Sequence, residues 1–411
     1  MENSILTVPA ARTIPVQAYT KTEYTEVVVP EGVEIIEPKA FQYCSNLRRL
    51  HLPRSLRYIE LKAFEGCPLE EIIFAGMPSE WEQVEISPVK NNTVLTARKR
   101  FALPGEAAVR ASRTDRSPQI YAQARALLES GGDGRLHVFV PELMIPGSYF
   151  KYGDLMLLIF PHGSTMVVDV GRDDCHLRTE SFLDAAGVSN LDYLVFSHTC
   201  PDHVAGGPLL IKHIWKRGGE VRHLWWTGQK HGDEIPMMVE MLREHGAETD
   251  GAVRAGRSFE IDGTKADILG PTEEELQGDA DIGKIRNGQS MLLRITVGKG
   301  IFLTCGDLFE QHEKRAVERC GSELRADLMK TNHHGGYTSN ENAWLDAVQP
   351  RAAFSCSNDN GCIRLIEELR RRGVDYASTG CQGLLHFALS AEGEIEKTTQ
   401  YDEMINIMRV N

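Results

Sequence analysis

The sequence predicts a layered α/β domain preceded by a short repeat segment. Apolar runs of strand length alternate with helix-length stretches from Leu136 to about residue 395, which is the pattern of sheets covered by helices. Several of these strands end in aspartate, histidine or cysteine, the side chains that hold metal ions in proteins. Ahead of this region, apolar residues recur at a fixed spacing, which indicates a repeat architecture. The chain therefore divides into a repeat segment and a larger α/β domain.

Composition limits the classes of protein to which the chain can belong. Its 411 residues are enough for two or three domains, and its formal net charge of −13 argues against a nucleic-acid coat or a binder of anionic membranes. No apolar run approaches the length of a membrane span, and the first residues lack a signal-peptide pattern. The nine scattered cysteines are typical of reduced thiols. We therefore expect a cytoplasmic protein that binds no membrane, with long nucleic acids as a disfavoured ligand.

A repeat begins near residue 27, after a polar extension of residues 1–26 that either pairs as an edge strand or stays loose. Two units share four positions, each recurring 23 residues later: Pro30 and Pro53, Ile36 and Ile59, Phe41 and Phe64, Cys44 and Cys67. A fixed period of this size predicts a β-solenoid in which each unit packs on the next. We expect this two-repeat segment at residues 27–90, as an interaction surface for a protein partner or as a structural cap.

A connector with one helix is expected over residues 91–134. Alanine and leucine recur at helical spacing between Tyr121 and Leu128, and Gly131 provides a helix end. The basic run from Thr96 to Arg100 is typical of a solvated face, with nucleic-acid binding as the alternative. The sequence thus predicts a linker between the repeats and the α/β domain.

The α/β domain is expected over residues 135–395, followed by a C-terminal tail of residues 396–411. Short apolar runs predict strands at residues 137–140, 156–160, 166–170, 191–196, 224–227, 266–271, 290–297, 300–303, 326–330, 351–355 and 383–389. Apolar residues at helical spacing predict helices at residues 181–186, 209–217 and 235–245, one ending near residue 320, and one at 363–372. Strands mixed with helices in this way favour layered sheets with helices outside.

The loop after the strand at residues 191–196 contains a dense cluster of side chains that can bind metal. His198, Cys200, Asp202 and His203 fall within six residues, and all four are of metal-ligand type. A tight loop at a strand end can direct several of them to one point, and the following Gly-Gly pair lets the backbone turn closely. We expect a metal site here; the alternative is a polar loop that caps a helix, with Asp202 as the N-cap.

Other predicted strands end in residues of the same kind. Asp169, Asp307 and the pair His333 and His334 each stand directly after a predicted strand. Loops at strand ends assemble sites from distant parts of a chain on a rigid sheet. We therefore expect these side chains to lie close to residues 198–203, which we call the metal-ligand loop.

Two stretches resemble known families. Residues 27–88 resemble the BspA-like, treponemal type of leucine-rich repeat, in which Ile-Pro-x-x-Val-x-x-Ile-x-x-x-Ala-Phe-x-x-Cys-x-x-Leu recurs. Residues 136–390 resemble a metallo-β-lactamase-fold hydrolase, whose hallmark after a strand is His-x-His-x-Asp-His, here at residues 198–203. More narrowly, they resemble the soluble β-lactamase-like domain of ComEC-type competence proteins. The motifs that carry this resemblance are Gly153-Asp154, Asp169-Val170-Gly171, Asn287-Gly288-Gln289-Ser290 before Leu303-Thr304-Cys305-Gly306-Asp307, and Lys330 through His333-His334-Gly335-Gly336 to Ser339.

The resemblance implies a four-layer αβ/βα metallo-β-lactamase sandwich, with two facing mixed sheets, helices outside and metals at one edge. It implies that His198 and Cys200 bind one metal, that Asp202 and His203 bind a second, and that Asp307 bridges them. His334 or His333 would complete the set. Asp169 would fix a ligand histidine by a hydrogen bond. The implied cofactor is one or two zinc ions, with manganese as the alternative.

Cys200 departs from the family pattern, which has histidine at this position. A thiolate also binds zinc, at about 2.3 Å, and a soft ligand favours zinc over manganese or magnesium. Three outcomes stay open: a thiolate ligand, a first metal of lower Lewis acidity, or a first site that is lost, with metal held only by Asp202 and His203. A second departure lies at residues 357–363, where the family's Gly-His-Pro is missing and Cys362 either replaces the histidine or packs.

These features predict a metal-dependent hydrolase that acts on a phosphodiester or other ester through a metal-activated water. Asp202 would orient that water or accept its proton. The expected substrate is a small-molecule or nucleotide-type ester. The alternative is a catalytically weakened metal-binding protein for interaction or sensing, with the repeats as its recognition surface.

Overall fold

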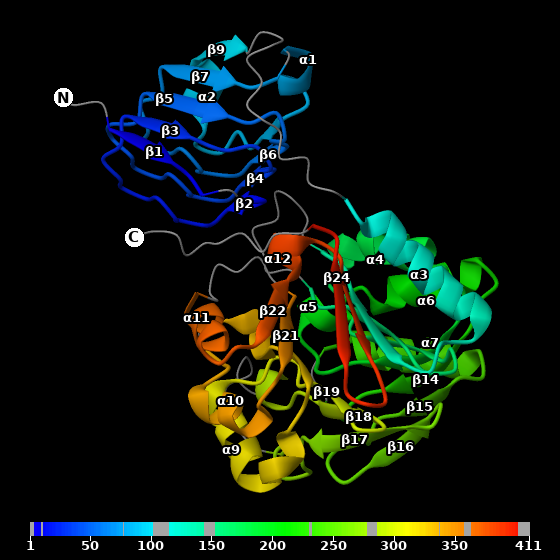
Figure 1. Ribbon diagram of the computed structural model, residues 1–411. Helices are drawn as coiled ribbons and strands as arrows, with labels where there is room; N and C mark the ends of the chain where they lie inside the picture. Colours follow the sequence, from blue (N-terminus) through cyan, green and yellow to red (C-terminus); the bar gives the residue numbers. More distant parts are fainter. Residues whose placement is uncertain are drawn as a thin grey trace. The chain divides into compact units, whose positions relative to one another are not determined.

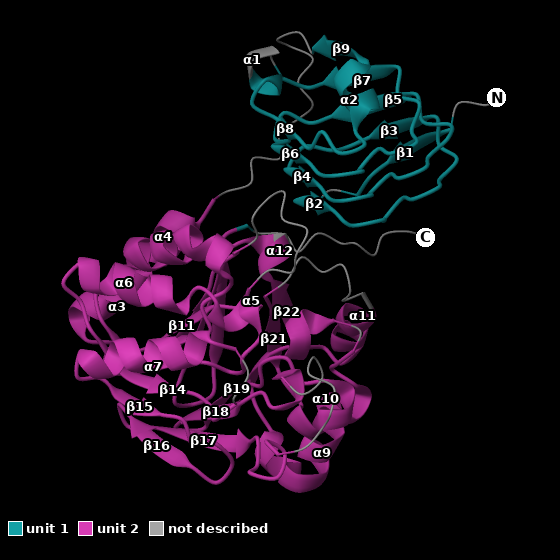
Figure 2. Ribbon diagram, turned by 180° about the vertical axis from the view of Figure 1, so that it is seen from behind, with its two compact units in different colours: residues 1–114, 145–150, 401–411 teal, residues 115–144, 151–400 magenta. Residues whose placement is uncertain are grey.

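The computed structural model describes residues 4–9, 11–76, 78–101, 115–143, 153–229, 232–277, 286–336, 338–356 and 363–401. The chain forms two compact units, coloured separately in Figure 2. Unit 1 comprises Met1–Thr114, Ile145–Phe150 and Tyr401–Asn411, and unit 2 comprises Asp115–Met144 and Lys151–Gln400. Each unit has its own sheets and its own buried apolar core.

Unit 1 contains two parallel sheets that run across the repeats (Figure 1). The five-stranded sheet has the order β1 (Ile5–Thr7), β3 (Glu26–Val28), β5 (Arg49–Leu52), β7 (Glu71–Phe74), β9 (Arg98–Phe101). The four-stranded sheet has the order β2 (Thr13–Ile14), β4 (Ile35–Ile36), β6 (Tyr58–Ile59), β8 (Glu85–Ile86). The short helices α1 (Pro78–Trp81) and α2 (Asn92–Thr96) follow β7 and β8.

The repeat structure is longer than the segment predicted at residues 27–90. The predicted extension contributes β1 and β2, so it pairs at the sheet edge, which is the first of its two predicted outcomes. The predicted linker contributes β9, which pairs with β7 through its backbone. Neither the first nor the last strands of this region carry all the apolar positions of the two central units. The sequence pattern therefore did not predict their pairing.

Side chains at equivalent repeat positions stack on one another inside unit 1. The ring of Phe41 stacks on those of Tyr19 and Phe64, with centroids 5.2 Å apart in both pairs. On the outer face of the five-stranded sheet, Arg98 forms an ion pair with Glu71 of the neighbouring strand. Such same-position pairs stabilise neighbouring strands. Repetition of one unit therefore generates both the core and the surface of this region.

Two facing sheets form the centre of unit 2. The eight-stranded sheet has the order β15 (Glu248–Asp250), β14 (Val221–Trp225), β13 (Leu191–Val195), β12 (Thr165–Val168), β11 (Met156–Ile159), β10 (Leu136–Val140), β23 (Leu385–Leu389), β24 (Ile395–Thr399). The seven-stranded sheet has the order β16 (Ser258–Ile261), β17 (Thr264–Gly270), β18 (Leu292–Val297), β19 (Gly300–Thr304), β20 (Leu328–Lys330), β21 (Ala352–Ser355), β22 (Asp375–Ser378). Apolar side chains of both sheets form one core, in which Phe354 of one sheet stacks on Phe387 of the other at 5.2 Å.

Helices lie outside both sheets and complete four layers, as predicted (Figures 1 and 2). The eight-stranded sheet is covered by α3 (Ser117–Ser130), α4 (His176–Ala186), α6 (Gly207–Lys216) and α7 (Glu234–Glu244). The other sheet carries α9 (Glu310–Cys320), α10 (Asn342–Val348) and α11 (Ile363–Arg371), and α12 (Thr379–Gln382) follows β22. Within the described part of the chain, none of the helices has both the length and the apolar character needed to cross a bilayer.

Two predicted boundaries of unit 2 need correction. The helix assigned to the linker, α3, belongs to unit 2, where Tyr121 contacts Phe182 of α4 with ring centroids 6.2 Å apart. The last strand is β24 rather than β23, so the sheet continues into residues predicted as a tail. β24 has the weakly apolar sequence Ile-Glu-Lys-Thr-Thr and is held by backbone pairing to β23.

Candidate metal centre

The candidate centre lies where parallel strands of both sheets end. β12 and β13 are parallel neighbours in one sheet, and β19 and β20 are parallel neighbours in the other. Asp169 follows β12, the metal-ligand loop follows β13, and Asp307 follows β19. His333 and His334 lie in a short turn, η3 (Asn332–Gly335), directly after β20. Because the carboxyl ends of parallel neighbours share one sheet edge, side chains distant in sequence meet there.

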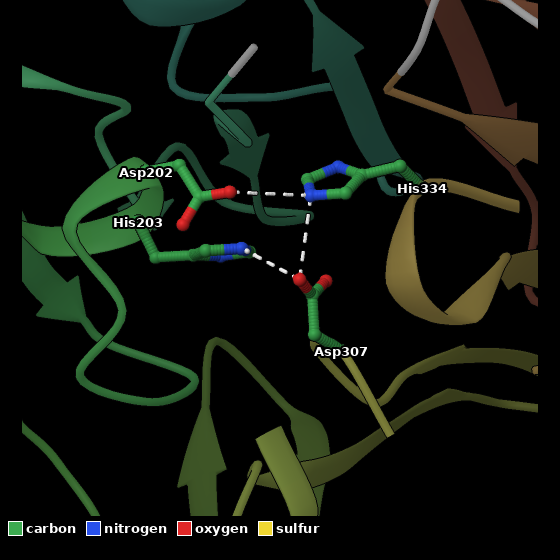
Figure 3. A group of neighbouring side chains, drawn as sticks. All are labelled: Asp202, His203, Asp307 and His334. Carbon is green, nitrogen blue, oxygen red and sulfur yellow. Dashed lines mark ion pairs between the residues drawn. The ribbon is translucent and has the colours of Figure 1, made fainter. Parts of the chain in front are cut away.

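Four of the predicted ligands form one compact group, which we call the ligand group: Asp202, His203, Asp307 and His334. Their ligand atoms all lie within 4.8 Å of one another. Oδ2 of Asp307 lies 3.3 Å from Nε2 of His203 and 3.3 Å from Nε2 of His334. Nε2 of His334 also lies 3.5 Å from Oδ2 of Asp202, and Figure 3 shows the four side chains pointing toward a common centre.

Buried carboxylates orient the two histidine rings of the ligand group. Nδ1 of His203 lies 2.8 Å from Oδ2 of Asp169, and Nδ1 of His334 lies 2.9 Å from Oδ1 of Asp154. A ring that donates through Nδ1 presents Nε2 to the other side, which is the usual arrangement of metal-binding histidines. Asp169, itself in the left-handed region at φ 57°, also accepts hydrogen bonds from the backbone and hydroxyl of Ser197. It therefore fixes the metal-ligand loop as well as His203.

His198 lies beside the ligand group but is not one of its four members. Its ring centroid is 4.1 Å from that of His203. Nδ1 of His198 lies 3.0 Å from the Ser197 hydroxyl, which donates its own proton to Asp169 and so can only accept from the ring. Burial lowers the pKa of His198 to about 3, so the ring is neutral and Nε2 carries a lone pair. That Nε2 is buried and makes no hydrogen bond.

Cys200 lies apart from the ligand group. Its thiol donates a hydrogen bond of 3.0 Å to Oδ1 of Asn287, and its sulfur is not among the atoms that converge within 4.8 Å. Burial, with Asp202 and Asp307 nearby, raises the pKa of the thiol to about 12, so it is protonated at neutral pH. The same residue is the N-cap of the short helix α5 (Pro201–Val204). The predicted alternative that Asp202 caps this helix is therefore wrong, because the helix begins at Pro201 and Asp202 lies within its first turn.

His333 also lies outside the ligand group. Its Nδ1 is 2.6 Å from the Thr338 hydroxyl, and its Nε2 is 4.0 Å from Oδ2 of Asp307. Of the two neighbouring histidines, His334 is the one whose Nε2 approaches both Asp202 and Asp307. His333 and His334 both have left-handed backbone angles, with φ of 47° and 55°, which an unsupported loop would avoid.

A buried carboxylate from α9 holds the loop that carries these histidines. Oε1 of Glu313 accepts hydrogen bonds from the Asn332 side chain at 2.7 Å and from the Asn340 backbone at 2.6 Å. The side chain of Asn340 in turn bonds to both backbone groups of Asn332. These contacts join the two ends of the loop and support its strained turn.

Asp154 and Lys330 lie at the candidate centre, in positions that the sequence did not reveal. Both side chains are fully buried, and Nζ of Lys330 lies 2.6 Å from Oδ2 of Asp154. Asp154 thereby connects a buried ammonium to His334. The available signal was Gly153, where a side chain would collide with the backbone of Gly171 and Asp202. Only glycine allows the segment before β11, which carries Asp154, to approach the metal-ligand loop this closely.

Charges around the ligand group fit a divalent cation. Burial opposes ionisation of Asp307, but His334 and His203 hold its pKa well below its usual range. Burial likewise opposes protonation of these two rings, yet Asp307 raises the pKa of each. The centre contains the carboxylates of Asp154, Asp169, Asp202 and Asp307 and the buried ammonium of Lys330. A divalent cation bound to the two rings can take the place of their protons and keep the same balance of charge. Nε2 of His203 and Oδ1 of Asp307 are buried without a hydrogen bond, as metal-facing atoms would be.

The second predicted departure, at residues 357–363, cannot be compared with the geometry, because residues 357–362 lie outside the described part of the chain. Cys305 is buried in the core beside Asp307.

Sequence comparison identifies both parts of the chain. Residues 12–93 match the family described as BspA type leucine rich repeat region, and residues 154–356 match the metallo-beta-lactamase superfamily. Competence protein ComA of Neisseria gonorrhoeae is 31% identical over 216 residues, which are 51% of this chain and 27% of that protein. ComE operon protein 3 of Bacillus subtilis is 23% identical over 211 residues, 50% of this chain and 26% of that protein. The chain spans about a quarter of the length of these curated relatives.

Among solved structures, the metallo-beta-lactamase fold protein YhfI from Bacillus subtilis is similar with a TM-score of 0.39 and 13% identity, over 64% of this chain and 100% of that chain. The predicted relationships to both families are confirmed by the sequence matches. The chain thus combines a BspA-type leucine-rich repeat region with a metallo-β-lactamase superfamily domain that resembles part of the competence proteins.

Proposed function

We propose that unit 2 is a metal-dependent hydrolase that cleaves a phosphodiester or another ester. The observation that carries this proposal is the ligand group itself, in which two histidines and two aspartates from three separate loops converge within 4.8 Å. Imidazole and carboxylate together suit zinc, and manganese is the second choice. The match to the metallo-β-lactamase superfamily supports the same assignment.

The residues of the centre can be given distinct roles. Asp202, His203, Asp307 and His334 would hold the metal, which when bound polarises the substrate oxygen and lowers the pKa of water to about 7. Asp202 has the most exposed side chain of the four, at 19%, and its pKa is held at about 2 by His334 and His203 against the effect of burial. It is therefore an ionised carboxylate with access to solvent, placed to accept a hydrogen bond from the attacking water and to orient it.

Hydrolysis of bis-p-nitrophenyl phosphate tests the proposal. The purified protein with zinc or manganese should release p-nitrophenol, lose this activity after treatment with a chelator, and regain it when the metal is restored. Circular dichroism of the chelated protein controls for unfolding. A protein that binds neither metal and releases no product with either of them would refute the assignment.

A weakened metal-binding protein for interaction or sensing is the second candidate, favoured by the contact between Cys200 and Asn287. We expect Cys200→His to add a neutral nitrogen ligand beside His198 and to raise hydrolysis at least tenfold if the natural centre is weakened. Cys200→Ser, which keeps a donor for Asn287, is the matched control. Loss of an existing activity in both variants would instead identify the thiol as a working ligand.

A further inference from the structure

Arg286 is a positively charged residue beside the metal-ligand loop for which the described residues offer no ion-pair partner. Its side chain is partly exposed, while its Nε is buried and makes no hydrogen bond. Arginine almost always satisfies its donors in a folded protein, so the unbonded Nε and the partial exposure of the side chain indicate a guanidinium that can turn to an acceptor from outside.

Two contacts fix the backbone of Arg286 against the metal-ligand loop. Gln229 accepts a hydrogen bond of 2.9 Å from the backbone of Thr199 and donates one of 2.8 Å to the carbonyl of Arg286. The next residue, Asn287, accepts the thiol hydrogen bond of Cys200 at 3.0 Å. Arg286 therefore stands next to the residues that precede Asp202. The negative charges of Asp202 and Asp307 raise the pKa of the Cys200 thiol, whereas the positive charge of Arg286 lowers it.

An anionic substrate needs such a cation. The chain carries a formal net charge of −13, so a negatively charged ligand is repelled over most of its approach to the protein. Lys330 cannot contact such a ligand, because its side chain is fully buried and its Nζ lies 2.6 Å from Oδ2 of Asp154. A guanidinium presents a planar fork of donors that matches two phosphate oxygens, which makes arginine the preferred residue for this contact.

We propose that Arg286 binds the anionic oxygen of a phosphodiester substrate and thereby selects charged over neutral esters. This rests on the proposed hydrolytic function and specifies its substrate class. Arg286 contributes to substrate binding and leaves the ligand group itself unchanged.

The test compares a charged and a neutral ester in three variants. Arg286→Gln should raise the KM for bis-p-nitrophenyl phosphate about tenfold or more, the range for a lost charge-assisted hydrogen bond. The kcat/KM for neutral p-nitrophenyl acetate and the zinc stoichiometry should stay unchanged. Arg286→Lys should recover part of the loss, because it keeps the charge without the fork. Arg222→Gln, which removes a surface arginine paired with Asp192, is the control for net charge.

Binding measured without turnover separates this inference from the proposed function. Equilibrium dialysis of bis-p-nitrophenyl phosphate with chelator-treated protein, in which no turnover is expected, should show at least tenfold weaker binding to Arg286→Gln than to the wild-type protein. If the wild-type protein binds the diester in this Arg286-dependent way but does not cleave it, the hydrolase assignment fails and the anion site stands. Equal diester affinity or equal KM in both proteins, or equal losses with the charged and neutral esters, would overturn the role of Arg286.

Discussion

Replacing Asp307 with asparagine is expected to abolish tight metal binding and to lower hydrolysis by more than about 100-fold, because loss of a residue that only supports a ligand already costs about 10–100-fold. Oδ2 of Asp307 lies 3.3 Å from Nε2 of both His203 and His334, so it is the carboxylate that both rings share. Asparagine has the same size but removes the charge and can present a donor where the metal needs an acceptor. The metal content and the rate with bis-p-nitrophenyl phosphate measure the effect.

Thermal unfolding with and without zinc separates this loss from misfolding. A metal that binds only the folded state stabilises it, by about 2.7 kcal/mol at a concentration 100 times its Kd. Zinc should therefore raise the Tm of the wild-type protein and leave that of Asp307→Asn unchanged. Asp184→Asn, at an ion-paired aspartate on the outer surface of α4, should respond to zinc like the wild type. An Asp307→Asn protein with wild-type zinc affinity and turnover would contradict the proposed ligand set.

Replacing Lys330 with methionine is expected to destabilise unit 2 by about 3–5 kcal/mol, the cost of breaking a buried ion pair from one side. Nζ of Lys330 lies 2.6 Å from Oδ2 of Asp154, and both side chains are fully buried. Methionine fills a similar volume but removes the ammonium and leaves the carboxylate of Asp154 with the ring of His334, 2.9 Å away, as its partner. Urea unfolding in the presence of a chelator, followed by tryptophan fluorescence, measures the change.

The double variant Lys330→Met with Asp154→Asn identifies the cause of this loss. Removing both charges should recover much of the stability, because no isolated charge then remains buried. Lys265→Met, at a lysine whose side chain is 65% exposed and paired with Asp267, should cost no more than about 1 kcal/mol. If Lys330→Met unfolds at the same urea concentration as the wild type, the ion pair has no structural role.

Local patterns in the sequence predicted the elements that are apolar or amphipathic over their full length. The hairpin of β18 and β19 and the helices α6 and α7 lie where these patterns placed them. β24 was assigned to a tail and β9 to a linker, since their sequences are mostly polar or charged. Both strands are held by backbone hydrogen bonds to a neighbouring strand, and such pairing leaves little trace in a single sequence.

The sequence predicted only those residues of the candidate centre that belong to short motifs. The motifs name every member of the ligand group, and the structure brings those four side chains together. The contact of Asp154 with His334 joins residues 180 positions apart, and that of Cys200 with Asn287 joins residues 87 positions apart. Both depend on how the two sheets face each other, so neither could be derived from spacing. Cys200 lies outside the ligand group because its thiol bonds to Asn287.

Diffraction from crystals grown with zinc, recorded on both sides of the zinc absorption edge, tests the central claim most directly. The account predicts one strong anomalous peak among Asp202, His203, Asp307 and His334, with Nε2 of His203 about 2.0–2.1 Å from the ion. A further peak between His198 and position 200 would be compatible with a second metal. Crystals with no peak at the ligand group, or with zinc only at His198 and Cys200, would contradict the account.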